Sequence, residues 1–113
     1  MLPAWSPPEM ILEIAGDDSA LVTEMIESYQ SDTAKRIDQI RVAMANSDAA
    51  VLKYQVHAIK GSSKQMEAHA VASLCEQIEA QLREGSIDDV RGMAQQLEMR
   101  ILEICAAMAL FQK

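Results

Sequence analysis

A short stretch of this sequence, from His57 to Ser62, gathers residue types that suit phosphate chemistry. A neutral imidazole nitrogen is a nucleophile near neutral pH, and a phosphoryl group that arrives on it carries about two negative charges. The Lys60 ammonium can neutralise part of that charge, Gly61 leaves room for a bulky donor, and Ser62 offers a hydroxyl. Glycine costs a helix about 1 kcal/mol relative to alanine, so its presence beside the histidine calls for a reason.

The imidazole of His57 also needs a group that holds the ring. One ring nitrogen must donate its proton to an acceptor so that the other nitrogen is free to attack. Glu79 is the candidate acceptor, because it follows Ile78 at the edge of the apolar face expected for residues 68–84. If this helix is the antiparallel neighbour of the one that carries His57, the two side chains can meet.

Basic residues surround the histidine on its expected helix face. Lys53, Lys60 and Lys64 follow one another at spacings that bring them to the same side as His57. Arg83 comes one turn after Glu79. We therefore treat Lys53, Lys64 and Arg83 as candidates for contact with a phosphate or a partner, with a solvated surface as the alternative.

The elements that must position these residues are helices. Apolar residues recur at a helical period in five segments, at about 8–15, 18–45, 49–66, 68–84 and 87–111. Asp17, Asp18 and Ser19 offer an N-terminal cap, and residues 86–89 resemble a capping box. Four amphipathic helices joined by short loops pack most simply as an antiparallel bundle. We expect an all-α fold, an antiparallel up-down-up-down four-helix bundle with a short N-terminal helix.

The chain of 113 residues has the size of one domain, with the core bundle expected over about 18–112. The methionine-rich stripes and Ser63 are expected in the core, and Trp5 is a candidate anchor for the N-terminal helix. The expected core stripe of the last helix is Val90, Ala94, Leu97, Ile101, Ile104, Met108 and Phe111. Because every apolar stripe is then used internally, we expect a monomer.

Composition disfavours several classes of protein. The net charge of −7 argues against a nucleic-acid binder, which is normally basic. No segment approaches the ~20 apolar residues of a membrane span, and the first residues lack the pattern of a signal peptide. We expect a cytoplasmic protein with no membrane partner. Cys75 and Cys105 fall on apolar stripes, which indicates reduced core residues rather than a disulfide or metal pair.

The segment HAIKGSSKQMEAHAVASLCEQIE, residues 57–79, resembles the signature of histidine-containing phosphotransfer (HPt) domains. That signature reads H-x-x-K-G-S-S, followed at fixed spacing by an apolar residue, often Cys, and an acidic or amide residue. Cys75 and Glu79 stand at these places. The resemblance implies that His57 accepts a phosphoryl group, Lys60 supports it, Gly61 permits close docking, and Glu79 orients the ring.

The resemblance also implies the partners and the cofactors. The phosphoryl group would come from the aspartyl phosphate of one response-regulator receiver domain and pass to the aspartate of another, and a hybrid sensor histidine kinase is a further expected partner. Magnesium belongs to the receiver domain, so no cofactor or metal is expected on this chain. The protein would be a phosphocarrier and not an enzyme.

One position departs from the family pattern, and three alternative functions stay open. Ten residues after His57 the family usually has glycine, whereas this sequence has Glu67. An HPt-like module can dock receivers without transfer, and chemotaxis-type kinases carry a similar phosphoacceptor domain. A metal site would use His57, His69 and Cys75, but their spacing fits no familiar ligand pattern.

Overall fold

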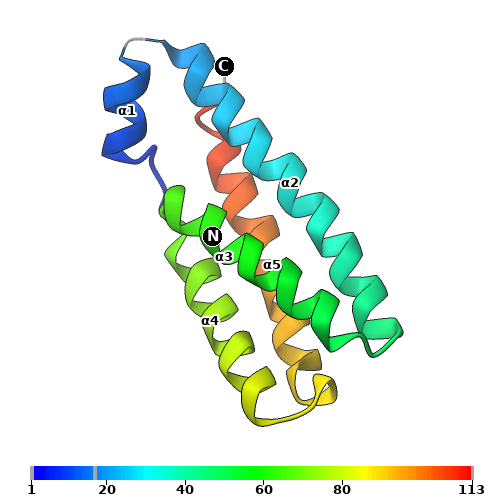
Figure 1. Cartoon of the computed structure of the whole chain (residues 1–113). Helices are drawn as coiled ribbons and strands as arrows, with labels where there is room; N and C mark the ends of the chain where they lie inside the picture. Colours follow the sequence, from blue (N-terminus) through cyan, green and yellow to red (C-terminus); the bar gives the residue numbers. More distant parts are fainter. Residues whose placement is uncertain (1, 17, 113) are drawn as a thin grey trace.

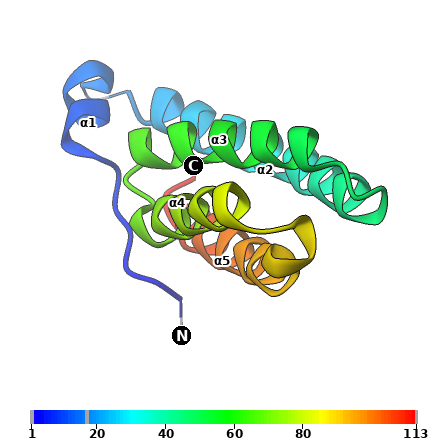
Figure 2. The ribbon, with the colours of Figure 1, turned by 60° about the horizontal axis from the view of Figure 1, so that its bottom comes forward.

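The computed structural model describes residues 2–16 and 18–112. Its helices are α1 (Glu9–Ala15), α2 (Ser19–Ala45), α3 (Ala49–Gln65), α4 (His69–Glu84), the 3₁₀ helix η1 (Ile87–Val90) and α5 (Arg91–Ala109). Consecutive long helices run in opposite directions, and α1 lies beside the end where α3 meets α4 (Figure 1). Seen after rotation, α2 and α3 form one layer over α4 and α5 (Figure 2). The described residues contain no strand, which confirms the all-α prediction.

Acidic side chains define where the helices begin. The Asp18 carboxylate accepts hydrogen bonds from two backbone N–H groups of the first turn of α2, at 3.0 and 3.2 Å. Asp48 accepts one from the first turn of α3 at 3.2 Å. Asp17, the neighbouring candidate cap, lies outside the described residues. The predicted capping box is present, and the Asp89 carboxylate accepts the Ser86 N–H at 2.7 Å. Such caps pair N–H groups that the helix leaves free.

Each long helix contributes one apolar stripe to a common core. The largest fully buried apolar side chains are Ile26, Leu52, Ile59, Ile78, Leu97, Ile101 and Met108. Burying such a side chain contributes roughly 1.5–3 kcal/mol, so the stripes fix how each helix is rotated about its axis. That rotation decides which residues of α3 and α4 face outward.

Two hydroxyls inside the core join α2 to α3. The Tyr29 and Ser63 hydroxyls lie 2.8 Å apart, and Ser63 is fully buried. Thr33, also fully buried, donates to the Tyr29 carbonyl at 2.8 Å. The prediction that Ser63 is a core residue is confirmed. Because both hydroxyls are paired, their burial does not carry the cost of an unsatisfied polar group.

One residue of the predicted core stripes is at the surface. Phe111 lies beyond the end of α5 and is 37% exposed, because the helix ends at Ala109. Met10 and Met99, which are not on any of the predicted core stripes, are exposed as well. Leu102 of α5 is exposed beside Met99, so the apolar residues of this helix are not all used internally. The expectation of a monomer assumed that all apolar stripes are internal, and it stays a prediction.

Trp5 attaches the N-terminal segment to the bundle. Its indole N–H donates to the Met66 carbonyl at the end of α3, at 2.7 Å. Its ring meets the ring of Phe111 edge-on, with centroids 5.4 Å apart, a favourable aromatic geometry. The three chain segments around residues 5, 66 and 111 therefore meet at one end of the bundle.

The turns after α2 and α3 have the same backbone conformation. Ser47 and Glu67 both have positive φ, 53° and 55°. In each turn the next residue donates its N–H to the carbonyl five residues earlier, Asp48 to Ala43 and Ala68 to Ser63, both at 2.8 Å. This pattern ends many helices, and glycine is the usual residue at the left-handed position. The place of Glu67 is therefore one that favours glycine.

Glu67→Gly is expected to raise the free energy of unfolding by roughly 1 kcal/mol, because glycine adopts positive φ without the steric cost of a Cβ atom. Glu67→Ala is the matched control, since it removes the carboxylate and keeps the Cβ. Urea unfolding at neutral pH measures both. Equal stabilities for the two variants would contradict a backbone origin.

Within the described residues, no helix is both long enough and apolar enough to cross a membrane.

Candidate phosphotransfer site

His57 lies on the outer side of α3, where its side chain contacts Glu79 of α4. Its neighbour Val56 is fully buried, as is Ile59. This holds the His57 side chain outward, and that side chain is 70% exposed. Its Nδ1 atom lies 3.2 Å from Oε2 of Glu79 on α4. The structure therefore brings together the two residues that the sequence suggested could meet across antiparallel helices.

Glu79 is the buried member of this group. Its side chain is only 9% exposed, and its Oε1 atom lies 2.6 Å from Nζ of Lys60. Lys60 is itself largely covered, at 21% exposure. One carboxylate thus contacts both His57 and Lys60, one with each oxygen. The sequence had suggested Lys60 for a phosphate, but here its ammonium is paired with Glu79.

The charge state of Glu79 follows from these contacts. Burial acts to raise the pKa of its carboxyl, but the contacts with Lys60 and His57 outweigh burial, and the pKa lies below its ordinary value. Glu79 is therefore ionised at neutral pH and acts only as an acceptor. An acceptor at Nδ1 keeps the proton on that nitrogen and leaves Nε2 with a free lone pair.

Glu79→Gln is expected to lower the free energy of unfolding by about 1–2 kcal/mol at pH 7, because hydrogen bonds to a charged group are lost. The pKa of Glu79 is lower in the folded state, so its contribution is full above about pH 4.3, the ordinary value, and disappears as the pH falls through the folded pKa. The difference between native protein and variant should therefore shrink as the pH falls.

Urea unfolding at pH 7, 4 and 3 measures this difference. Glu76→Gln is the matched control, since Glu76 is 54% exposed and pairs with Lys64 at the surface. A difference between native protein and Glu79→Gln that stayed constant with pH would contradict the charge-based account.

Gly61 leaves the surface beside this group open. A Cβ atom built on Gly61 meets nothing within 4 Å, so the fold itself does not require glycine at this position. The same holds for Gly92 in α5. Since glycine weakens a helix, Gly61 lowers the stability of α3 without a packing reason within the chain.

Ser62 does not join His57 and Glu79. Its hydroxyl donates to the Ile59 carbonyl in its own helix at 3.2 Å. It lines a hollow between α2 and α3 together with Met25 and Asp32. The structure therefore places Ser62 toward α2, away from the contacts that Glu79 makes between α3 and α4.

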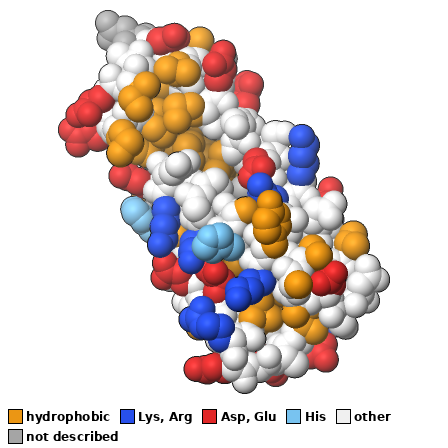
Figure 3. All heavy atoms as spheres, viewed as in Figure 1, with side chains coloured by type: hydrophobic (Ala, Val, Ile, Leu, Met, Phe, Trp, Pro, Cys, Tyr) orange, Lys and Arg blue, Asp and Glu red, His pale blue; other side chains and the backbone are white. Residues whose placement is uncertain are grey.

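The three basic candidates lie at the surface. Lys64 pairs with Glu76 across α3 and α4 at 3.0 Å, and Lys53 and Arg83 are exposed. Figure 3 shows basic side chains gathered around the histidines in the middle of one face, with acidic side chains between them. The basic residues thus surround the imidazole without forming a site of their own.

Sequence reasoning missed the apolar surface near this group. Met10 and Ile14 of α1 are 71% and 69% exposed, and Tyr54, one turn before His57, is 67% exposed. Figure 3 shows an apolar patch over α1 on the same face as the histidines. The available signal was in α1 itself, where apolar residues occur on more than one side of a short helix.

The cysteines are free thiols. Burial raises the pKa of the Cys75 thiol to about 12, and burial also raises that of Cys105, partly offset by the Thr33 hydroxyl. Cys75 is buried, as predicted, while Cys105 is half-buried. Among the described residues, no group of three or more His, Cys, Asp or Glu side chains is arranged to hold a metal ion.

Comparison with known proteins identifies the family of this chain. The family model for the Hpt domain matches residues 24–107, most of the chain, so the chain belongs to the Hpt domain family. It is a histidine phosphotransfer domain of the kind used in phosphorelays. As a member of this family it is a phosphocarrier.

A solved structure has a similar fold. The crystal structure of the HPT domain from a sensor hybrid histidine kinase of Shewanella aligns with a TM-score of 0.74 and 21% identity, over 90% of this chain and 88% of that chain. A comparison with curated protein sequences found no match.

Proposed function

We propose that His57 is the phosphoacceptor of this phosphotransfer domain. The observation that carries the proposal is the exposed imidazole whose Nδ1 atom is held 3.2 Å from the ionised Glu79. This contact leaves Nε2 directed away from the acceptor and available as a nucleophile. His69, the only other histidine in the sequence, lies at the start of α4 without a contact of this kind in the described structure.

The transfer step forms one bond and breaks one. The Nε2 lone pair attacks the phosphorus of an aspartyl phosphate, the N–P bond forms, and the bond between phosphorus and the aspartate oxygen breaks. The electron pair returns to the aspartate as a carboxylate, while Nδ1 keeps its proton on the side of Glu79. Passing the group to a second aspartate reverses these changes.

Lys60 and Gly61 support the arriving group in different ways. The Lys60 ammonium, held by Glu79 before transfer, lies one turn from His57 and can turn toward the phosphoryl oxygens, where a cation offsets the added charge. Gly61 leaves open space for the donor. Lys53, Lys64 and Arg83 would contribute to the field around the site, and Ser62 would act only through its position near the docking surface.

The proposed partners are response-regulator receiver domains, together with a hybrid sensor histidine kinase. The exposed apolar side chains of Met10, Ile14 and Tyr54 support docking of a protein beside His57. We propose that magnesium stays on the receiver, so that this chain needs no metal or cofactor. Phosphoryl transfer depends mostly on positioning and charge stabilisation, which the receiver can supply, so this chain would have little catalytic activity alone.

The test is phosphotransfer from a panel of phosphorylated receiver domains carrying labelled phosphate and magnesium. The labelled protein should lose its phosphate in acid and keep it in alkali, because an N–P bond is labile in acid. A label that is stable in acid would indicate that the phosphoacceptor is a serine such as Ser62. Binding of receivers without any label would contradict transfer and favour a docking module.

A further inference from the structure

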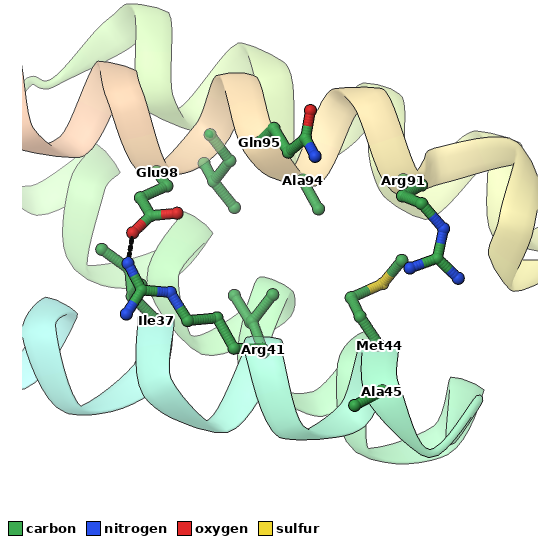
Figure 4. A pocket seen from close by; sticks show the side chains of 10 residues that line it. Ile37, Arg41, Met44, Ala45, Arg91, Ala94, Gln95 and Glu98 are labelled. Carbon is green, nitrogen blue, oxygen red and sulfur yellow. Dashed lines mark hydrogen bonds and ion pairs between the residues drawn. The ribbon is translucent and has the colours of Figure 1, made fainter.

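A cavity opens between α2 and α5, on the opposite pair of helices from His57 and Glu79. Its volume is about 350 Å³, at the small end of the range of roughly 300–1,000 Å³ typical of small-molecule sites. Figure 4 shows side chains of both helices pointing into it. The lining residues are Ile37, Ile40, Arg41, Met44, Ala45, Arg91, Ala94, Gln95, Leu97 and Glu98.

The cavity combines apolar walls with a charged rim. Ile37, Ile40 and Leu97 belong to the buried core, so an occupant would touch the inner faces of α2 and α5. Arg41 and Arg91 stand at opposite ends of the cavity (Figure 4). The rim thus holds two arginines against a single acid, Glu98, in a chain whose net charge is −7.

The two arginines differ in their existing partners. Arg41 is engaged by Glu98 across the gap and also lies 3.6 Å from Asp38, so its charge is already matched. Among the residues that the structure describes, Arg91 pairs only with Asp88, three residues earlier, and both members of that pair are at least half exposed. Exposed pairs of this kind contribute little, so the Arg91 guanidinium is available to another anion.

We propose that this cavity binds a small amphipathic anion, with its apolar body between α2 and α5 and its carboxylate at Arg91. The apolar walls favour a short alkyl or aromatic body. A planar guanidinium matches a carboxylate with two parallel hydrogen bonds. A cationic head group would be repelled by both arginines. A neutral head group would form no ion pair with Arg91.

The first experiment compares three probes of equal chain length and different head charge. Octanoate, octanol and octylammonium are titrated into the ¹⁵N-labelled protein, and backbone amide shifts are followed by NMR. Octanoate should give saturable shifts clustered at residues 37–45 and 91–98, with affinity roughly fivefold above octanol. Octylammonium should bind more weakly than octanol.

Two arginine variants distinguish binding in the cavity from a general effect of the positive charge on α5. Arg91→Gln should remove the preference for octanoate over octanol. Arg100→Gln is the matched control, because Arg100 also pairs with an acid three residues away, Glu103 at 2.9 Å, and does not line the cavity. An equal loss of octanoate affinity in both variants would overturn the assignment of the carboxylate to Arg91.

A third variant tests the apolar part. Ala94 points into the cavity in Figure 4 and is 8% exposed, so Ala94→Leu should fill part of the space and block octanol and octanoate alike. Circular dichroism and thermal unfolding establish that the variant is folded. Unchanged binding in a folded Ala94→Leu variant would overturn the proposal.

The remaining outcomes also overturn it. Shifts that are scattered over the surface, or that do not saturate, would mean that the cavity is only loose packing. Tighter binding of octylammonium than of octanoate would reverse the assigned charge. Because these measurements do not involve phosphate, they are independent of the proposed role of His57.

Discussion

A chain that carries glutamine in place of His57 is expected to take up no phosphoryl group from any phosphorylated receiver domain. Glutamine has a similar reach and can still contact Glu79, but its amide has no nucleophilic nitrogen. His57 is 70% exposed, so the substitution should leave the core intact. Phosphotransfer with labelled receivers measures the loss, and circular dichroism and thermal unfolding check the fold.

His69→Gln is the matched control, because the sequence has only these two histidines. His69 is exposed at the start of α4, and its replacement should leave phosphate uptake unchanged. If His57→Gln kept its label and His69→Gln lost it, the acceptor would be His69. Label on both variants would indicate that the phosphoacceptor is not a histidine.

Gly61→Gln is expected to slow phosphotransfer by about 5- to 150-fold while it makes the isolated protein more stable. The first effect follows because added bulk at a packed contact costs typically 1–3 kcal/mol. The second follows because glutamine is a better helix former by roughly 0.5–1 kcal/mol, and a Cβ at Gly61 meets nothing within 4 Å. Transfer rates and urea unfolding of the same samples measure the two effects.

Gly92→Gln provides the comparison for this variant. Gly92 is also exposed within a helix, and a Cβ there also meets nothing within 4 Å. The two variants should gain similar stability, but only Gly61→Gln should lose transfer. Normal transfer in Gly61→Gln would mean that the receiver approaches His57 from another side.

The helices could be predicted from the sequence because helical periodicity and capping residues act locally. Asp18, Asp48 and the Ser86–Asp89 capping box mark helix starts in the sequence and in the structure. The exposure of Phe111 could not be predicted in this way, because the end of α5 has no strong stop signal. Met99 lies outside the predicted core stripe of this helix, and its exposure agrees with that stripe.

The candidate site could be predicted in part. The pairing of His57 with Glu79 follows from two helix faces and an antiparallel arrangement, both readable from the sequence. The contact between Lys60 and Glu79 could not be predicted from the sequence, because a long flexible side chain can reach several partners. Only the distance between α3 and α4 selects one of them. The left-handed backbone conformation at Glu67 was not predicted for a different reason, since glutamate seldom adopts positive φ.

Trp5 gives this protein an optical property that follows directly from its contacts. It is the only tryptophan in the sequence, and its indole is hydrogen-bonded to the Met66 carbonyl and meets the Phe111 ring edge-on. Its emission therefore reports on the meeting of the two chain ends with the α3–α4 turn, while far-ultraviolet circular dichroism reports on the helices as a whole. The detachment of the N-terminal segment and the melting of the bundle can thus be followed separately in one unlabelled sample.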